Sequence, residues 1–419
     1  MVLSIEQVDN ALRAATAARQ LGDGVEERRI LDEALRIAPQ DPRVLNAAGM
    51  AALSIKDFEP ARAYFATAVE ADPKAPPLWM NLATACRGLG DDEGEKTALD
   101  GALAIDLRHF TANLRMAELH QRCGQAKAAA VSWSAIVQMA ATIPDPSPQV
   151  ADAMKRGQRF LSDHNNQIQE KIDDELSGQL ATMGSDARRF QVCLDYALRG
   201  RPIYNNHCTG IHYPFLPADE FFDRRQFPWF AAIEAKTDAI RAEALALLEK
   251  GGDAIRPYVK QEKGTPENKW SALNDSLDWS ACFLWEYGER NDAICALCPE
   301  TAAALELVPQ SNIPGKAPSA FFSILKPGAH IPPHTGVTNT RAIVHLPLVV
   351  PSDCLFRVGG ETREWTVGEA FAFDDTIEHE AWNRSTERRI VLIFDVWNPH
   401  LTPVEQDLLT RFFDITSRE

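Results

Sequence analysis

Hydrophobic and small positions in the first third of the chain repeat with a period of 34 residues. The apolar segment 34–39 recurs at 68–73 and again at 102–107. Proline stands at the end of the first two segments, where it ends a helix cleanly. The pattern predicts an array of paired helices, in which small residues allow close approach and large residues fill the space between: Gly49, Ala83 and Ala117, and Phe65, Leu99 and Trp133.

A period of 34 with small, bulky and proline positions in this order resembles the tetratricopeptide repeat. About three and a half units fit residues 5–140, although Leu107 replaces the proline of the third unit, and Glu27 and Glu95 replace a small residue of the second helix. An α-solenoid of this kind offers a concave surface for a peptide or partner protein. A scaffold for packing or self-association is the alternative.

A linker and a polar helix follow the repeats. Segment 141–148 holds three prolines within five residues, which marks a break between elements. From Gln149 to about Gly200 the composition is polar and predicts one helix that caps the solenoid. We therefore divide the chain into a repeat domain over 1–140, a linker and capping helix over 141–200, and a further domain over 201–419.

The last part of the chain changes from helical to strand-like patterning. Short runs rich in Val, Ile and Phe, bounded by Gly, Pro or Asp, predict strands. Several such strands after a helical region suggest a double-sheet jelly roll, also called a double-stranded β-helix, and a helix over Trp229–Glu249 should brace one sheet. The chain is thus expected to be an α + β multidomain protein, with strands at 319–326, 340–347, 353–358, 370–373 and 389–396.

Histidines are concentrated in the predicted jelly roll. His334 and His379 lie 45 residues apart, and each stands at the end of a predicted strand. Two histidines placed in this way fit the manner in which such a fold carries non-haem iron. Arg389 follows ten residues after His379. Its guanidinium fork suits the distal carboxylate of 2-oxoglutarate.

Longer motifs around these residues resemble the aspartyl/asparaginyl β-hydroxylase family. The runs 334–345 and 357–368 match the first and middle motifs of the family, and 373–382 and 395–399 match its last ones. The close likeness extends from Asp278 to Leu401. It implies a dioxygenase that uses Fe(II), 2-oxoglutarate and O2.

The resemblance also implies residue roles. It places the iron on His334 and His379, with Gly336 where most related oxygenases carry an acidic third ligand, and the family lacks that acid too. It places Ser323 and Arg389 on the distal carboxylate of 2-oxoglutarate. Trp279 and His345 would line the same pocket.

Other residues of the motifs concern the substrate and the support of the site. The resemblance implies that Arg341 anchors an acidic or amide substrate, and Ile343 stands where the animal enzymes have a second arginine. His330 should support its turn without binding metal. Asp374 and Asp375 would either orient the histidines or cap a turn.

Composition excludes several classes of partner. The formal net charge is −16, which argues against nucleic acid and anionic membrane surfaces, because both require a basic surface. No apolar run is long enough to cross a bilayer, and the first ten residues show no secretory signal, so we expect a cytoplasmic protein. Of the eight cysteines only Cys295 and Cys298 form a C-x-x-C pair, which we interpret as buried reduced thiols in preference to a redox or metal site.

Three hypotheses of function follow. The first is hydroxylation of the β-carbon of Asp or Asn in a protein or peptide presented by the repeats. The second is hydroxylation of a free amino acid or small metabolite, with the repeats serving assembly into an oligomer. The third is a non-enzymatic repeat scaffold.

Overall fold

The computed structural model describes residues 5–250, 252 and 254–417. Contacts within the chain divide it into two compact units, residues 1–200 and residues 201–419. We describe each unit by itself.

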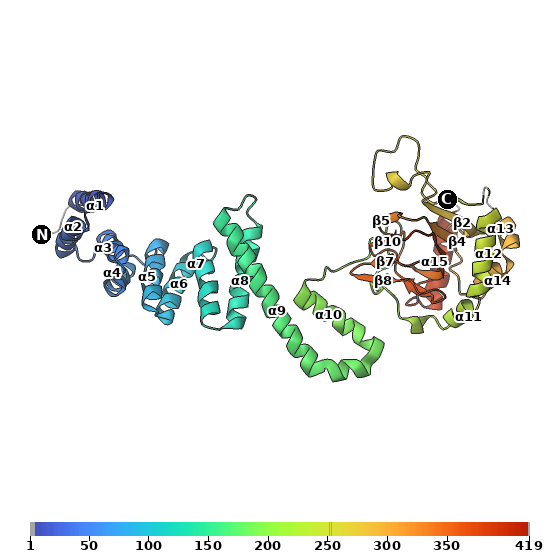
Figure 1. Cartoon of the computed structure of the whole chain (residues 1–419), viewed down its shortest axis with the longest axis horizontal. Coiled ribbons are helices and arrows are strands. Elements are labelled where there is room, and N and C mark those ends of the chain that lie inside the picture. Colours follow the sequence, from blue (N-terminus) through green and yellow to red (C-terminus); the bar gives the residue numbers. More distant parts are fainter. Residues whose placement is uncertain (1–4, 251, 253, 418–419) are drawn as a thin grey trace. The chain divides into compact units, whose positions relative to one another are not determined.

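The first unit begins with eight helices in antiparallel pairs (Figure 1). Helices α3, α5 and α7 begin at Pro42, Pro76 and Phe110, so the period of 34 is confirmed in the structure. The helices are α1 Ile5–Gln20, α2 Gly24–Ile37, α3 Pro42–Ser54, α4 Phe58–Ala71, α5 Pro76–Leu89, α6 Asp92–Ile105, α7 Phe110–Arg122 and α8 Ala126–Ala141.

Small and large residues of the repeats pack as the pattern predicts. A Cβ on Gly49 would lie 2.6 Å from Cε1 of Phe65, so only glycine fits there without a shift of the ring. Phe65 and Leu99 are fully buried, and Trp133 is 1% exposed. These side chains fill the space between paired helices and between neighbouring pairs.

Two helices close this unit, where one was expected. Helix α9 runs over Pro148–Met183, and its buried Ala153 packs with Trp133 of α8. The expected single helix to Gly200 is wrong, because the chain leaves the helix at Gly184 with φ of 54°. A short 3-10 turn, η1 Gly184–Ala187, leads into α10 Arg188–Arg199. Helix α10 returns along α9, and Asn165 donates to the carbonyl of Leu198 over 2.8 Å.

The second unit contains two antiparallel sheets, and this confirms the expected double-sheet architecture. The larger sheet has the order β1-β2-β4-β11-β6-β9, with β3 paired to β2, and the smaller has the order β5-β10-β7-β8. The strands of the larger sheet are β1 Arg256–Pro257, β2 Trp279–Glu286, β3 Glu289–Arg290, β4 Ala320–Leu325, β6 Arg341–Val349, β9 Phe371–Phe373 and β11 Arg389–Trp397. Those of the smaller are β5 His330–His334, β7 Cys354–Val358, β8 Glu361–Glu364 and β10 His379–Asn383.

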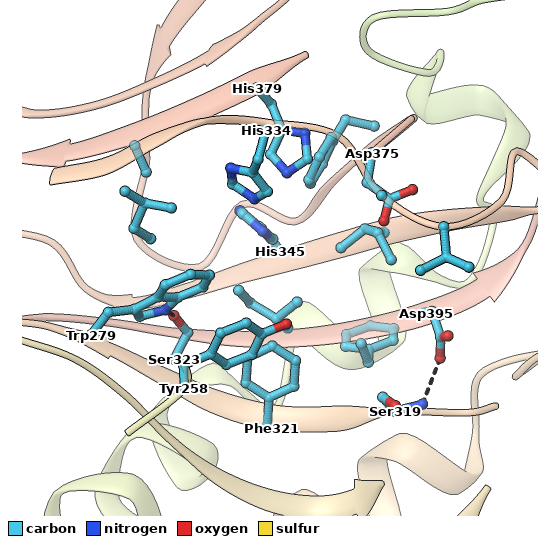
Figure 2. Close-up of a pocket in the computed structure, with 18 of the residues that line it drawn as sticks. Tyr258, Trp279, Ser319, Phe321, Ser323, His334, His345, Asp375, His379 and Asp395 are labelled. Carbon is cyan, nitrogen blue, oxygen red and sulfur yellow. Dashed lines mark hydrogen bonds between the residues drawn. The ribbon is translucent and has the colours of Figure 1, made fainter. Parts of the chain in front are cut away.

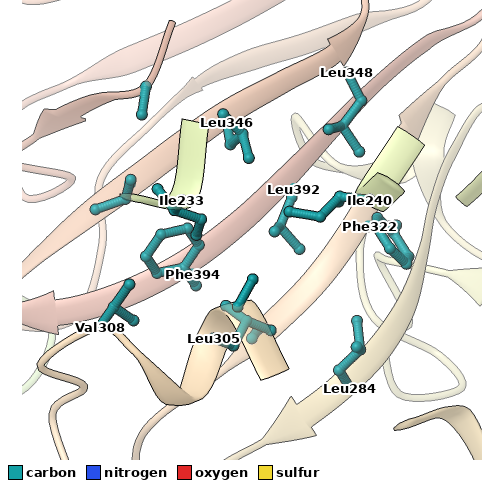
Figure 3. Close-up of a cluster of buried hydrophobic side chains, with 14 of the residues drawn as sticks. Ile233, Ile240, Leu284, Leu305, Val308, Phe322, Leu346, Leu348, Leu392 and Phe394 are labelled. Carbon is teal, nitrogen blue, oxygen red and sulfur yellow. The ribbon is translucent and has the colours of Figure 1, made fainter. Parts of the chain in front are cut away.

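Helices cover the outer face of the larger sheet (Figure 3). The helix expected over Trp229–Glu249 is interrupted around Ala235 and forms two pieces, α11 and α12. Cys295 and Cys298 lie buried in this core, and all eight cysteines are unpaired. The helices and 3-10 turns of this unit are η2 Arg224–Gln226, α11 Phe230–Glu234, α12 Thr237–Lys250, η3 Ser271–Leu273, α13 Asp292–Leu297, α14 Pro299–Glu306 and α15 Pro403–Thr416.

Alternation along the central strands separates core from cavity. On β11, Ile390, Leu392 and Phe394 enter the helix-covered core, whereas Arg389 and Ile393 face the space between the sheets. Strands β4 and β6 divide in the same way, because successive side chains of a strand point to opposite faces. Within the described residues we find no helix with the length and hydropathy of a bilayer-spanning segment.

Candidate active site

A cavity of about 430 Å³ lies between the two sheets (Figure 2). The odd-numbered residues of three neighbouring strands point into it: Phe321 and Ser323 of β4, Arg341, Ile343 and His345 of β6, and Arg389, Ile393 and Asp395 of β11. Register between the strands therefore brings together residues that are up to 74 positions apart in sequence.

Two histidines face each other in this cavity. His334 on β5 pairs directly with His379 on β10, and the two ring centroids lie 4.0 Å apart. Nδ1 of His334 contacts the carbonyl oxygen of Pro332 at 2.8 Å, and Nδ1 of His379 contacts that of Ile377 at 3.0 Å. A carbonyl only accepts, so each Nδ1 carries the proton and each Nε2 keeps its lone pair.

Burial keeps both imidazoles neutral. It lowers the pKa of His334 to about 4 and the pKa of His379 well below its ordinary value. A metal ion needs the unprotonated ring, so at neutral pH no proton must be displaced before binding. Backbone carbonyls of the residue two positions earlier orient both rings, the support that metal-binding histidines require.

No acidic side chain extends from position 336. A Cβ on Gly336 would lie 2.0 Å from Oδ2 of Asp375, whose carboxylate fills that volume. In the described part of the chain, no three His, Cys, Asp or Glu side chains are grouped closely enough to hold a metal ion. A metal at this place would rest on the histidine pair.

A buried arginine stands at one end of the cavity. Arg389 is 1% exposed, and its Nη2 donates to Oγ of Ser323 over 3.1 Å. Trp279 Nε1 donates to the same hydroxyl over 3.1 Å. Nε of Arg389 has no hydrogen-bond partner, and burial lowers the pKa of Arg389 to about 10. A buried cation without a carboxylate is costly, so this end of the cavity fits an anionic ligand.

His345 borders the same end. It is buried, and Trp365 Nε1 donates to its Nδ1 over 3.3 Å. Burial, followed by the charge of Arg389, lowers the pKa of His345 well below its ordinary value. The neutral ring therefore carries its proton on Nε2. The structure thus places Trp279, Ser323, His345 and Arg389 around one space, as the sequence motifs suggested.

The opposite end of the cavity holds Arg341, which is already paired. Its guanidinium forms an ion pair with Asp395 of β11, and Asp395 also accepts the amide of Ser319 over 2.7 Å. The prediction that Arg341 anchors an acidic or amide substrate stays a prediction, and the structure adds that Asp395 offsets the charge of this arginine. Ile343 lies beside Arg341 on the cavity face of β6.

Asp374 and His330 take structural positions. Asp374 accepts from the amide and hydroxyl of Thr376 and from Asn206, so it caps a turn and does not contact either histidine ring. The ring of His330 stacks on Trp382 with centroids 5.3 Å apart, outside the cavity.

One part of the site, and one segment that supports the loops beside it, were missed at the level of sequence. Asp395 was recognised only as a motif residue, and its role depends on the pairing of β6 with β11. The segment 206–213 was linked to the family only by a fainter likeness at Tyr213 and Pro214, and not to the loops of the site. It crosses beside the 335–340 and 374–377 loops, where Gly210 donates to Val337 and Tyr213 to Asn339. No periodic or compositional signal marks such contacts.

Comparison with known proteins concerns both units. Residues 234–399 match the family model of the aspartyl/asparaginyl β-hydroxylases, and residues 42–74 match a tetratricopeptide repeat model. The human aspartyl/asparaginyl β-hydroxylase is 36% identical over 176 residues, which cover 42% of this chain and 22% of that protein. The ornithine lipid ester-linked acyl 2-hydroxylase of Rhizobium tropici is 34% identical over 197 residues, 46% of this chain and 66% of that protein. The chain thus spans about a fifth of the first relative and just under two thirds of the second.

Solved structures with helical repeats are also similar, at low scores. MamA from Desulfovibrio magneticus is 19% identical with a TM-score of 0.31, covering 33% of this chain and 78% of that one. The O-GlcNAc transferase of Thermobaculum terrenum is 21% identical with a TM-score of 0.31, covering 35% and 29%. Scores of this size carry no argument about the site.

Proposed function

Because this chain carries an aspartyl/asparaginyl β-hydroxylase family domain behind tetratricopeptide repeats, we propose that it is an Fe(II)- and 2-oxoglutarate-dependent dioxygenase. The proposed reaction is hydroxylation of the β-carbon of Asp or Asn in a protein or peptide. The relatives support a hydroxylase. The cofactor, the cosubstrate and the acceptor are our proposal.

One observation carries the proposal. Two neutral histidines present free Nε2 atoms in a cavity whose far end holds a buried arginine with no carboxylate partner among the described residues. A divalent metal between the rings and a dicarboxylate against Arg389 would satisfy both groups. A structural role explains neither the free lone pairs nor a buried guanidinium that has no carboxylate partner.

Each residue then has a defined task. His334 and His379 would hold Fe(II), and Arg389 with Ser323 would bind the distal carboxylate of 2-oxoglutarate. Trp279 and His345, which line the same cavity, would enclose the cosubstrate and exclude water from it. Bound iron and 2-oxoglutarate supply the activation of O2 and the cleavage of the C–H bond. The protein supplies neutral ligands, a counter-charge and the orientation of the acceptor.

The repeats support a macromolecular acceptor, since such arrays hold extended peptides on their concave surface. A second candidate is a small molecule, either a free amino acid or an acyl chain of the kind named for the Rhizobium tropici relative. The apolar cavity residues Phe321, Ile343 and Ile393 favour it. The third candidate is a non-enzymatic scaffold, which does not explain the histidine pair in the cavity.

Anaerobic titration of the full chain with Fe(II) and 2-oxoglutarate tests the proposal. We expect one metal per chain, its loss in His334→Ala and His379→Ala, and its retention in His330→Ala, which removes a histidine of the same strand outside the cavity. Succinate release under O2 should follow metal binding. Equal metal binding by all three variants would contradict the proposed site. Mass spectrometry of host proteins with and without the enzyme, searching for one added oxygen on Asp or Asn, would then identify the acceptor.

A further inference from the structure

The end of the cavity opposite Arg389 presents a hydrogen-bond donor and an acceptor side by side. Figure 2 shows Asp375 and Asp395 at one end of the cavity, and Trp279 and Ser323 at the other. Building on the proposed function, we propose that this end recognises a primary carboxamide. The hydroxylated substrate residue would then be Asn and not Asp.

Arg341 enters this end with its charge already balanced. Asp395 is 3% exposed and holds the Arg341 guanidinium in an ion pair. The amide of Ser319 donates to the same carboxylate, which fixes the pair in place. A guanidinium has five N–H donors in a rigid fork. Arg341 can therefore still donate a hydrogen bond into the cavity, although its positive charge is offset by Asp395.

Asp375 provides the hydrogen-bond acceptor at this end of the cavity. Its side chain lines the cavity, and no other side chain in the described part of the chain donates a hydrogen bond to it. Of the cations that line the cavity, Arg341 acts on Asp375 but is shared with Asp395. Arg389 stands at the far end, and Lys316 directs its ammonium to within 5.2 Å of the Phe413 ring centroid. Ile343 adds no charge.

A carboxamide matches this arrangement and a carboxylate does not. The amide oxygen of Asn can accept from Arg341 while its NH2 group donates to Asp375. The carboxylate of Asp has only acceptors, so above about pH 7, where Asp375 is ionised, one oxygen would face the like charge of Asp375 in an enclosed space. Sites that hydrogen-bond a substrate group reject an analogue lacking that group strongly, by up to about four orders of magnitude.

Paired substrates test this inference on the full chain. Two peptide pools with randomised flanks would differ only in a central Asn or Asp, and free L-asparagine and L-aspartate would distinguish a peptide from a small-molecule source. Added oxygen is measured by mass spectrometry with Fe(II) and 2-oxoglutarate at pH 8, where Asp375 is ionised. Binding is measured separately by fluorescence anisotropy of labelled pools on metal-free protein, in which no turnover occurs.

We expect the wild type to prefer Asn over Asp by at least about tenfold in both measurements. Asp375→Asn should reduce or reverse the preference for Asn over Asp substrates, since the new amide can donate to a substrate carboxylate. A ratio of two substrates on one enzyme cancels any common loss of iron. Asp292→Asn, which removes an exposed charge of the same domain outside the cavity, should leave the ratio unchanged.

An equal or reversed preference in the wild type would overturn the inference and leave the proposed oxygenase intact. The inference would also be overturned if neither substrate were hydroxylated while succinate was still released. Loss of Fe(II) and 2-oxoglutarate binding from the wild type would instead refute the proposed function itself. The wild-type ratio decides the question even if a variant fails to fold.

Discussion

The carboxylate of Asp375 occupies the volume into which a side chain on Gly336 would project. A Cβ at residue 336 would lie 2.0 Å from Oδ2 of Asp375, and the amide of Gly336 donates to the Asp375 carbonyl over 2.6 Å. The acidic group of this region thus comes from the loop before β10 and not from the strand that carries His334. Gly336 is required by this close approach.

An acid cannot simply be placed at residue 336. We expect Gly336→Asp to lower both thermal stability and metal affinity, because two carboxylates would compete for one enclosed space. Combining it with Asp375→Gly should recover at least part of both losses, since the second change vacates the volume. Thermal unfolding and Mn(II) titration of the two single variants and the double variant form a complete cycle. Additive losses in the double variant would contradict the steric argument.

Arg389 should contribute to the binding of 2-oxoglutarate and not to the thermal stability of the ligand-free protein. In the ligand-free protein its buried charge lacks a carboxylate, so Arg389→Met should leave thermal stability equal to or above that of the wild type. The affinity for 2-oxoglutarate should fall by about one to two orders of magnitude, because each charge-assisted hydrogen bond contributes roughly 1.5–3 kcal/mol. Calorimetry with 2-oxoglutarate measures the loss, and metal affinity should change little.

The exposed neighbour Arg388 provides the control for this prediction, because Arg388→Met removes the same charge outside the cavity. Saturating 2-oxoglutarate should stabilise the wild type and Arg388→Met, by about 2.7 kcal/mol at a hundredfold excess over Kd, but not Arg389→Met. Equal stabilisation of all three would show that the distal carboxylate binds elsewhere.

The stability of the metal-free protein should depend on the protonation of Asp375. Burial raises the pKa of Asp375 from 3.8 to about 7. The folded state therefore binds this proton more tightly than the unfolded state, and the stability it contributes is complete below about pH 4 and lost as the pH rises through about 7. Asp375→Asn cannot titrate, so the melting temperature of the variant minus that of the wild type should increase from pH 4 to pH 8. A difference independent of pH would mean that Asp375 is not enclosed as described.

Glu95 should be a stability determinant of the repeats. Its fully buried carboxylate pairs with Arg115 at 3.0 Å and with Arg122 at 2.7 Å, both on the following helix α7. Glu95→Ala leaves Arg115 without an acidic partner, while Arg122 keeps its ion pair with Asp92, and should cost about 1–3 kcal/mol of unfolding free energy, measured with denaturant. Glu93→Ala, a change at an exposed neighbour, should stay within about 0.5 kcal/mol of wild type.

Glu95 also shows what the sequence could predict. The period of 34 predicted where each helix pair would lie, because it reflects packing that repeats along the chain. It could present Glu95 only as a departure from the pattern, since its partners belong to the next unit. Likewise, the alternation of side chains along any strand is enough to put Arg341 and Ile343 on one face. The pair between Arg341 and Asp395 depends on the register between β6 and β11, in which Asp395 lies opposite Ile343. Contacts of this kind require the folded sheet.

The last prediction concerns Ile343 and the choice between amide and acid. Ile343 lies opposite Asp395 on β11 and Phe373 on β9, with its side chain in the cavity. An arginine there would face a region that holds two carboxylates and one guanidinium, and would leave that region electrically balanced. We therefore expect Ile343→Arg to raise hydroxylation of the Asp pool relative to the Asn pool, without raising activity on the Asn pool, whose amide needs no second cation. Ile343→Met keeps an apolar side chain of similar size and should preserve the wild-type ratio. Both ratios are measured by mass spectrometry of added oxygen. An unchanged ratio in Ile343→Arg, with metal and 2-oxoglutarate binding intact, would show that charge at this end of the cavity does not select the acceptor.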